Sequence, residues 1–152
     1  MDKLRVLCRA ITYDFDNHSI LLVRNLDQSW WYVPGGGWTY GKESIIECAS
    51  REVFEETGIK VNVLKLFYVQ TIFIKEKNST WLEMFWLAIP TGSREIPKDH
   101  VDEFGLVTEA RWFNKLDLEK IVIYPEVIKE NFWKNIFSVT EEDDRYVGHF
   151  EL

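Results

Sequence analysis

The chain has 152 residues, 46% of them hydrophobic and 15% aromatic, which is enough apolar material for one domain with a substantial core. Its formal net charge of -7 excludes a general basic surface for duplex nucleic acid. An acidic protein can still act on a phosphorylated substrate, because divalent cations placed between carboxylates and phosphates reverse the local charge. We therefore expect a single domain over residues 1–152 that acts on a small molecule.

Two features bear on the cellular compartment. The cysteines are Cys8 and Cys48, without CxxC spacing, and such a pair is typical of reduced thiols. Charged residues interrupt the first ten positions, so these contain no apolar signal-peptide core, and no apolar run elsewhere approaches membrane-spanning length. The sequence predicts a cytoplasmic protein with no membrane partner.

Two apolar runs near the start of the chain predict a β-hairpin. Residues 4–13 and 20–24 are rich in β-branched and apolar side chains, and the polar stretch 14–18 between them has turn composition. Residues 30–33 predict a further short strand. The proline and three glycines at 34–37 are expected to interrupt regular structure and to let the backbone approach another group closely.

The segment after the glycines carries the start and stop signals of a helix. Ser44 and Glu47 form a capping box, and Gly58 supplies the matching C-terminal stop. An apolar stripe recurs at helical spacing between these signals and consists of Ile45, Ile46, Ala49 and Val53. We therefore expect a helix between Ser44 and Gly58 that packs on a sheet.

The next part of the chain predicts a longer hairpin, a loop and a strand. Residues 61–74 and 81–89 are long β-like runs joined by a polar, turn-prone stretch. Residues 91–104 mix glycine, proline and charges and have loop composition, while 109–113 predict a short strand. A loop of this length in a small domain is often functional.

The C-terminal part predicts a second amphipathic helix. Apolar side chains recur at helical spacing in residues 124–137, with Pro125 near the first turn. For residues 141–152 the sequence leaves a strand and simple packing open as alternatives. Strands with helices on both sheet faces make an α/β protein, and the expected architecture is a layered α/β/α sandwich.

The first helix has an unusual concentration of acidic residues. Glu52, Glu55 and Glu56 are spaced i, i+3 and i+4, so their side chains share one face near the negative end of the helix dipole. A hard divalent cation removes this repulsion, and Mg²⁺ suits carboxylate oxygens completed by water and substrate phosphate. The competing interpretation is a solvated helix face, partly offset by Arg51 and Lys60.

The residues around these glutamates decide between the two interpretations. From Gly37 to Ile59 the sequence resembles the Nudix box at every fixed position. These positions are Gly37, Glu43, Arg51, Glu52, Val53, Glu55, Glu56, Gly58 and Ile59. One departure is visible, because the box glycine stands third after Pro34 instead of second.

The resemblance implies a Nudix-type α/β/α sandwich with a mixed central sheet and an enzymatic activity. Nudix hydrolases cleave a pyrophosphate bond in a nucleoside diphosphate linked to another moiety, with divalent-metal assistance. The implied cofactor is Mg²⁺, with Mn²⁺ as a substitute. The implied metal ligands are Glu52, Glu55, Glu56 and the backbone carbonyl of Gly37.

The resemblance also implies catalytic roles. Arg51 would orient a carboxylate of the cluster, and Glu43 would support the site from the helix entrance. The general base comes either from the box or from a carboxylate on a distant loop. Our first choice is Glu52 and our second is Glu103, which lies in a loop with several other acidic residues.

Substrate contacts are less well defined by the sequence. Trp38 and Tyr40 occupy variable positions inside the box loop and are expected near the phosphates, and Arg24 is a candidate phosphate contact. The tryptophans in general are expected to pack in the core or in hairpins. No subfamily marker identifies the substrate beyond a small nucleotide or another pyrophosphate.

Two alternatives to an active nucleotide hydrolase stay open. One is a nucleotide-sensing module that keeps the fold without efficient turnover, and the other is a hydrolase of a pyrophosphate that is not a nucleotide. The sequence also leaves a homodimer open beside a monomer.

Overall fold

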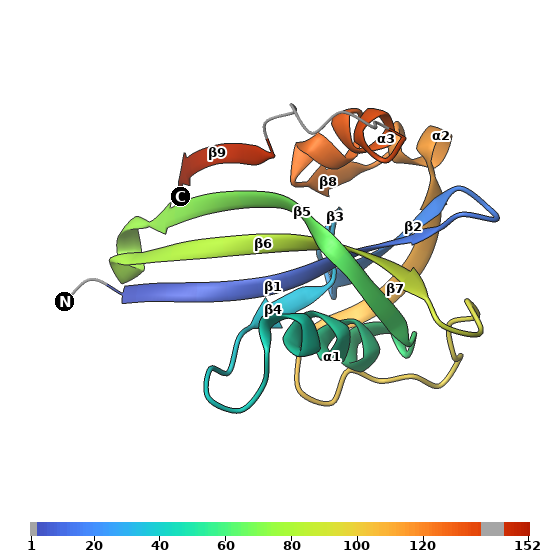
Figure 1. The fold of residues 1–152 in the computed structure, drawn as a ribbon, viewed down its shortest axis with the longest axis horizontal. Helices are drawn as coiled ribbons and strands as arrows, with labels where there is room; N and C mark the ends of the chain where they lie inside the picture. The colour runs from blue at the N-terminus through green and yellow to red at the C-terminus, as the bar shows by residue number, and fades with distance from the viewer. Residues whose placement is uncertain (1–2, 138–144) are drawn as a thin grey trace.

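The computed structural model describes residues 3–137 and 145–152, and its strands form one mixed sheet (Figure 1). In chain order the strands are β1 (Lys3–Asp14), β2 (Ser19–Asn25), β3 (Trp30–Tyr32), β4 (Gly35–Gly37), β5 (Val61–Ile74), β6 (Ser79–Pro90), β7 (Val107–Asn114), β8 (Val122–Tyr124) and β9 (Tyr146–Glu151). The helices are α1 (Ile45–Thr57), α2 (Lys115–Leu118) and α3 (Asn131–Asn135), with short 3-10 turns η1 (Lys75–Lys77) and η2 (Glu126–Ile128).

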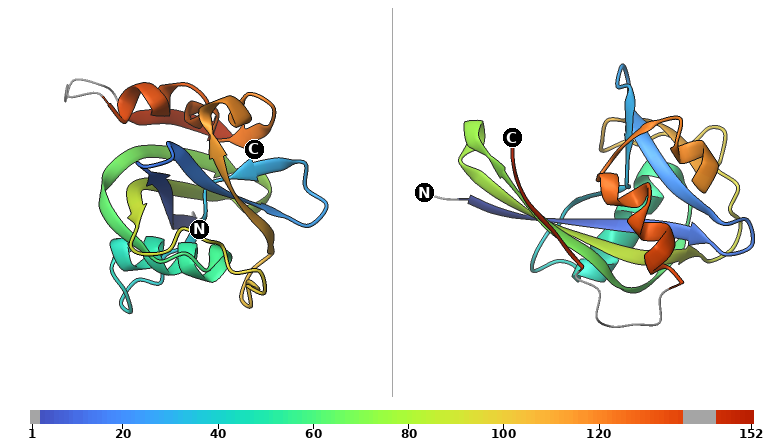
Figure 2. Two further views of the ribbon diagram at one scale, coloured as in Figure 1. Left: turned by 90° about the vertical axis from the view of Figure 1, so that its right-hand side faces the viewer. Right: turned by 90° about the horizontal axis from the view of Figure 1, so that it is seen from above.

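β1 is the central strand of this sheet. It forms the predicted hairpin with β2, where Tyr13 pairs with Ile20, and it runs parallel to β6, with residues 3–12 opposite 79–88. The strand order is β8-β3-β2-β1-β6-β5-β9, while β4 pairs with β1 and β7 pairs with β2. The sheet is strongly curled, and it combines parallel and antiparallel neighbours (Figures 1 and 2).

Helices cover both faces of the sheet, and each covered face has its own core. On β1, Cys8 and Ala10 face α1, while Ile11 and Tyr13 face the side of η2 and α3. α1 and α3 lie on opposite sides of β1 in Figure 1. The α/β fold with a mixed sheet between helices is therefore confirmed. No helix in the described part of the chain has the length and apolar character needed to cross a membrane.

The signals that predicted α1 act as expected. Ser44 Oγ accepts a hydrogen bond from the Glu47 backbone N–H at 3.1 Å, and Glu47 Oε2 accepts one from the Ser44 N–H at 2.9 Å. Gly58 has a φ of 78°, the left-handed conformation that ends the helix. Ala49 and Val53 are buried as predicted, but Ile46 is 47% exposed, because it lies off the face that contacts the sheet.

The glycine segment differs from the prediction. Gly35–Gly37 does not interrupt regular structure but forms β4, which pairs antiparallel with β1 from Arg9 to Leu7. A Cβ on Gly35 would overlap the Arg9 side chain and backbone, so glycine permits a close approach of the two strands. The composition signalled the close approach correctly but not the pairing that results from it.

The predicted helix over 124–137 is also wrong as a continuous element. Tyr124 ends β8, which runs parallel to β3, and η2 and the short α3 follow separately. Pairing in the sheet fixes an extended backbone at Tyr124, so no helix can start there. The apolar residues Ile128 and Phe132 are still buried in the core beside α3.

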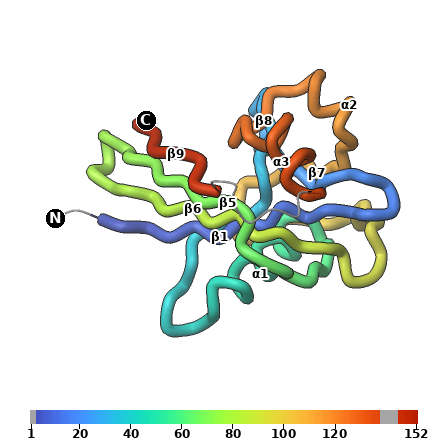
Figure 3. Tube along the Cα trace, turned by 45° about the horizontal axis from the view of Figure 1, so that its top comes forward, coloured from blue at the N-terminus to red at the C-terminus, as the bar shows by residue number. Residues whose placement is uncertain are grey.

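The C-terminal segment adds a strand. β9 lies beside β5 and runs parallel to it, with Phe150 opposite Ile72 (Figure 3). Of the two alternatives for residues 141–152, the strand is therefore correct for the described part, and residues 141–144 lie outside the described residues. The longer hairpin is confirmed as β5 and β6, and the strand predicted at 109–113 is confirmed within β7.

Candidate active site

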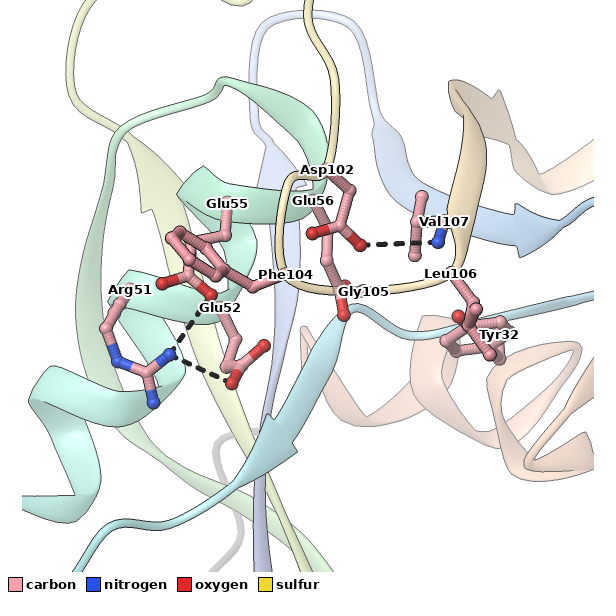
Figure 4. A pocket seen from close by; sticks show the side chains of 10 residues that line it. All are labelled: Tyr32, Arg51, Glu52, Glu55, Glu56, Asp102, Phe104, Gly105, Leu106 and Val107. Atoms are coloured by element: carbon pink, nitrogen blue, oxygen red, sulfur yellow. Dashed lines mark hydrogen bonds and ion pairs between the residues drawn. The ribbon is translucent and has the colours of Figure 1, made fainter.

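The acidic face of α1 borders a cavity of about 300 Å³ (Figure 4). The opposite walls come from β3 and from the loop that leads into β7. The lining residues are Tyr32, Arg51, Glu52, Glu55, Glu56, Asp102, Phe104, Gly105, Leu106 and Val107. The helical spacing that predicted one shared face for the three glutamates thus brings them to one cavity.

Arg51 connects the carboxylates of the box. It donates two hydrogen bonds to Glu43, each of 2.8 Å, and one from Nη1 to each of Glu52 (3.0 Å) and Glu55 (3.1 Å). The two-point contact lowers the pKa of Glu43 to about 2 and raises the pKa of Arg51. Glu43 therefore stays ionised and holds the guanidinium beside the cavity.

Glu56 is the most buried carboxylate of the cluster, with 9% of its surface exposed. Its carboxylate accepts a hydrogen bond from the Gly35 backbone N–H at 3.1 Å. Burial raises the pKa of Glu56 to about 9, and the charges of Glu52 and Asp102 act in the same direction, while Arg9 opposes them. Without a further cation, the folded chain disfavours the ionised form of this side chain.

Glu52 lies against the glycine strand. A Cβ on Gly36 would come within 2.6 Å of the Glu52 carboxylate, so this glycine leaves the space that the carboxylate occupies. Burial also raises the pKa of Glu52. Gly37, the predicted backbone ligand, does not line the cavity, and its carbonyl oxygen lies 3.6 Å from Cys48 Sγ.

The loop before β7 contributes Asp102 to the cavity, and not the predicted Glu103. Asp102 Oδ2 accepts a hydrogen bond from the Val107 backbone N–H at 3.3 Å, whereas Glu103 is exposed and does not line the cavity. The negative charge of Asp102 contributes to the raised pKa values of Glu52 and Glu56. The sequence placed an acidic group in this loop, but neighbouring residues in an irregular loop point in directions that composition does not determine.

The three predicted substrate contacts lie elsewhere. Arg24 is paired with Glu109 at 2.6 Å and stacks on Trp31. Trp38 packs on the core beside α1 and donates its Nε1–H to the Glu43 carbonyl oxygen at 2.9 Å, and the exposed Tyr40 contacts the Trp38 ring. None of these three side chains lines the cavity at the glutamates.

Sequence reasoning missed three side chains that do line the cavity, Tyr32, Phe104 and Leu106. Phe104 and Leu106 flank Gly105 in a loop that otherwise contains mainly charged residues. Large apolar residues on either side of a glycine in such a loop were the available signal.

The donor set of the cavity suits a hard cation. No three His, Cys, Asp or Glu side chains within residues 3–137 and 145–152 converge closely enough to ligate one ion together. Mg²⁺ does not require this, because it keeps several waters and binds through one or two carboxylates plus substrate phosphate. The buried Glu56 and its neighbour Glu52 are oxygen donors with raised pKa values, so a divalent cation beside them relieves an electrostatic cost. These residues fit Mg²⁺.

Comparisons with known proteins identify the family of the chain. The model of the NUDIX domain family matches residues 3–131. The mouse protein 8-oxo-dGDP phosphatase NUDT18 is 32% identical over 88 residues, an alignment that spans 58% of this chain but only 25% of that protein. A MutT protein from Bacillus halodurans is 25% identical with a TM-score of 0.69, over 97% of this chain and 89% of its own. A NUDIX hydrolase from Nitrosomonas europaea has the same fold, with a TM-score of 0.69 at 14% identity over 100% of this chain and 81% of its own. The resemblance seen in residues 37–59 is therefore confirmed, and the chain belongs to the NUDIX domain family.

Proposed function

We propose that the chain is a Mg²⁺-dependent hydrolase that cleaves a pyrophosphate bond in a nucleoside diphosphate linked to another moiety. The observation that carries this proposal is the gathering of four carboxylates, Glu52, Glu55, Glu56 and Asp102, around one cavity. Among the described residues that line it, Arg51 is the one cation, and three glutamates already share it. A site of this charge does not attract a pyrophosphate unless cations are bound in it.

The glutamates of α1 would hold the metal. Glu52, Glu55 and Glu56 would provide carboxylate oxygens, with one or two of them on any one ion, and Mn²⁺ could replace Mg²⁺ because both accept oxygen ligands. Bound there, a metal ion would supply positive charge against the phosphate oxygens and would lower the pKa of a water. We keep a backbone ligand from the glycine strand as part of the proposal, and Gly36 and Gly37 are its two candidates.

The other polar residues position this cluster. Glu52 is our first choice as general base, because its carboxylate lines the cavity, lies against Gly36 and is oriented by Arg51. Asp102 replaces Glu103 as our second choice, because Asp102 lines the cavity. Arg51 orients Glu52 and Glu55, and Glu43 fixes Arg51 in turn.

The names of the related proteins support a nucleotide as the substrate. The mouse relative is named as an 8-oxo-dGDP phosphatase, which acts on a nucleoside diphosphate. The pair of buried free thiols, Cys8 and Cys48, is compatible with the cytoplasmic location that we propose.

The test is a screen for hydrolysis with Mg²⁺ or Mn²⁺, using nucleoside triphosphates, nucleotide sugars, dinucleoside polyphosphates and capped RNA. We expect the wild-type protein to be active and Glu56→Gln to be at least a hundredfold slower. Acid–base and electrostatic effects of single groups change reaction rates by factors of the order of 10²–10⁴. Glu119→Gln, an exposed glutamate outside the cavity, is the matched control. Equal rates for Glu55→Gln, Glu56→Gln and wild type would show that the site is wrongly placed.

The same screen separates the alternatives. A sensing module would bind a nucleotide in calorimetry and return it intact, whereas the enzyme gives metal-dependent product. A hydrolase of another pyrophosphate would leave all nucleotides intact and consume a compound of that second class.

A further inference from the structure

The loop before β7 exposes large apolar side chains beside the acidic cluster. Val101, Phe104 and Leu106 are 70%, 82% and 76% exposed. Phe104 and Leu106 line the same cavity as the glutamates. Apolar groups gathered at a cavity and left in contact with water are typical of a ligand-binding surface.

The loop is held in a defined shape by Asp102. Its carboxylate accepts the hydrogen bond from the Val107 N–H and lies directly against Gly105, where an added Cβ would overlap it. Phe104 and Leu106 stand on either side of this glycine. Figure 4 shows Phe104 toward α1 and Leu106 toward Tyr32, so the two side chains border different parts of the cavity.

Tyr32 forms a rigid aromatic wall next to Leu106. Its hydroxyl lies 2.6 Å from Asn25 Oδ1, to which it donates, and the guanidinium carbon of Arg9 lies 5.7 Å from the ring centroid. Arg9 is itself fixed by the Val33 carbonyl oxygen at 3.0 Å and by Glu83 at 3.3 Å. The ring is therefore held in place before any ligand binds, and a rigid wall lowers the entropic cost of binding.

We propose that Tyr32, Phe104 and Leu106 form a nucleobase subsite that holds the base by stacking and apolar contact. This inference rests on the proposed function and names the part of the substrate that lies beside the pyrophosphate. A cavity of about 300 Å³ is at the lower end of the range for small-molecule sites. Two aromatic rings at its border favour a planar ring over a flexible aliphatic chain.

The same lining makes the subsite tolerant of base identity. The Tyr32 hydroxyl is bonded to Asn25, and Arg51 is bonded to glutamates. The side chains that remain are carboxylates or apolar groups, and stacking is sequence-tolerant because every base has a π-face. Purine and pyrimidine nucleotides are therefore expected to differ in affinity by less than about tenfold.

The adjoining cavity is a poorer place for the base. It has a volume of about 330 Å³, shares Glu56, Asp102 and Val107 with the first, and contains Lys98 and His100. Among the described residues that line it, His100 has the one aromatic ring, and its Nε2 lies 2.6 Å from the Glu55 carbonyl oxygen. A cavity with a lysine and no exposed aromatic wall lacks the stacking surface that the first one has.

The decisive experiment measures binding without turnover. In the presence of Mg²⁺, calorimetry compares a nucleoside diphosphate with a methylene bridge between its phosphorus atoms and methylenediphosphonate, which has no base. The Phe104→Ala protein should bind the nucleotide about tenfold more weakly, because the base loses a stacking face. The Leu106→Ala protein should also bind it more weakly, by a smaller factor, because only an apolar contact is lost. Both proteins should bind methylenediphosphonate as wild type does. Tyr32→Phe keeps the ring and should bind the nucleotide like wild type, whereas Tyr32→Leu should bind it about tenfold more weakly.

Leu116→Ala is the matched control, because Leu116 is a 68% exposed leucine on α2 that does not line the cavity. Saturation-transfer NMR gives a second measurement, in which the base protons should receive more saturation than the ribose protons. Unchanged nucleotide affinity in Phe104→Ala, Leu106→Ala and Tyr32→Leu would overturn the inference. So would tighter binding of a prenyl diphosphate analogue than of the nucleotide.

The outcome is separable from that of the proposed function. Base-dependent binding without hydrolysis of any nucleotide would support the subsite and contradict the enzyme. Hydrolysis of a nucleotide, together with a nucleotide affinity that none of the three substitutions changes, would support the enzyme and contradict the subsite.

Discussion

Arg51 and Glu43 face each other across the entrance of α1 with two parallel hydrogen bonds, Nε to Oε2 and Nη2 to Oε1, each of 2.8 Å. This geometry requires the planar fork of arginine, because a lysine ammonium cannot make two parallel contacts while also reaching Glu52 and Glu55. The pair connects the loop before the helix to the acidic face near its end.

The first prediction concerns this pair. Arg51→Lys should lower the free energy of unfolding by about 1–3 kcal/mol, the usual contribution of hydrogen bonds to charged groups. It should also lower activity, because Glu52 and Glu55 lose the group that orients them. Urea unfolding measures the first effect, with Arg111→Lys at an exposed ion pair as the control. A stability equal to wild type would show that the two-point contact contributes little.

The second prediction compares three glycines. A Cβ at Gly36 meets the Glu52 carboxylate at 2.6 Å, so Gly36→Ala should displace that side chain and reduce activity by about 10–100-fold, as changes next to metal ligands do. At Gly37 the nearest atom belongs to the exposed Arg5 guanidinium, which can move, so a smaller loss is expected. Gly92→Ala, with open space around the new methyl group, should leave activity unchanged. Steady-state kinetics at saturating Mg²⁺ test the order of the three activity losses. An inactive Gly92→Ala protein would show that the space around an added methyl group does not determine the loss.

The third prediction assigns the base. Asp102→Asn and Glu52→Gln should each reduce kcat, with the larger loss at Glu52, about 10²–10⁴-fold for a general base. Glu103→Gln should retain wild-type kcat, because its side chain is exposed and does not line the cavity. A kcat loss at Glu103 equal to that at Asp102 would mean that the loop rearranges when substrate binds.

The fourth prediction concerns the pH dependence of stability in metal-free protein. The pKa of Glu56 is about 9 in the folded state, against 4.5 for the unperturbed group, so between these pH values the folded state binds the extra proton. The free energy of unfolding should therefore fall as pH rises from about 4.5 to 9 through this group. Urea unfolding in the presence of a chelator measures the slope, and Glu56→Gln should flatten it.

Glu43 gives the opposite dependence at low pH. Its folded-state pKa of about 2 lies below the unperturbed 4.5, so the stability that it contributes should be lost as pH falls from 4.5 toward 2. Glu43→Gln should remove this part of the acid sensitivity. An equal slope in wild type and in the two variants would argue against both assignments.

The fifth prediction is that Mg²⁺ raises Tm. A ligand that binds only the folded state stabilises it by mass action, by about 2.7 kcal/mol at a hundredfold excess over Kd. The gain should grow from pH 6 to pH 8, because the metal competes with the proton on Glu56. Scanning calorimetry measures the increase in Tm caused by Mg²⁺, with Glu119→Gln as the control. Glu56→Gln should lose most of this increase. An unchanged Tm at millimolar Mg²⁺ would count against the acidic cluster as a metal site.

Local signals determined the parts of the structure that depend on neighbours along the chain. The capping box at Ser44 and Glu47 and the stop at Gly58 fixed α1, and helical periodicity alone placed the glutamates on one face. The same local reasoning failed for 124–137, where pairing of β8 with β3 overrides an apolar pattern of helical spacing. A periodic pattern indicates which side chains can share a helix face. It does not show whether the backbone pairs in the sheet instead of forming that helix.

The amino-acid sequence by itself determined the family, the helix that carries the carboxylates and the oxygen-rich chemistry of the site, because all of these are encoded within residues 37–59. Only the tertiary structure decided that Asp102 and not Glu103 joins the cluster, that the glycines form a strand on β1, and that Tyr32 lies beside Leu106. The physical reason is the separation in the chain. Contacts between β3, α1 and the loop before β7 arise from sheet pairing and core packing, and these depend on the whole fold.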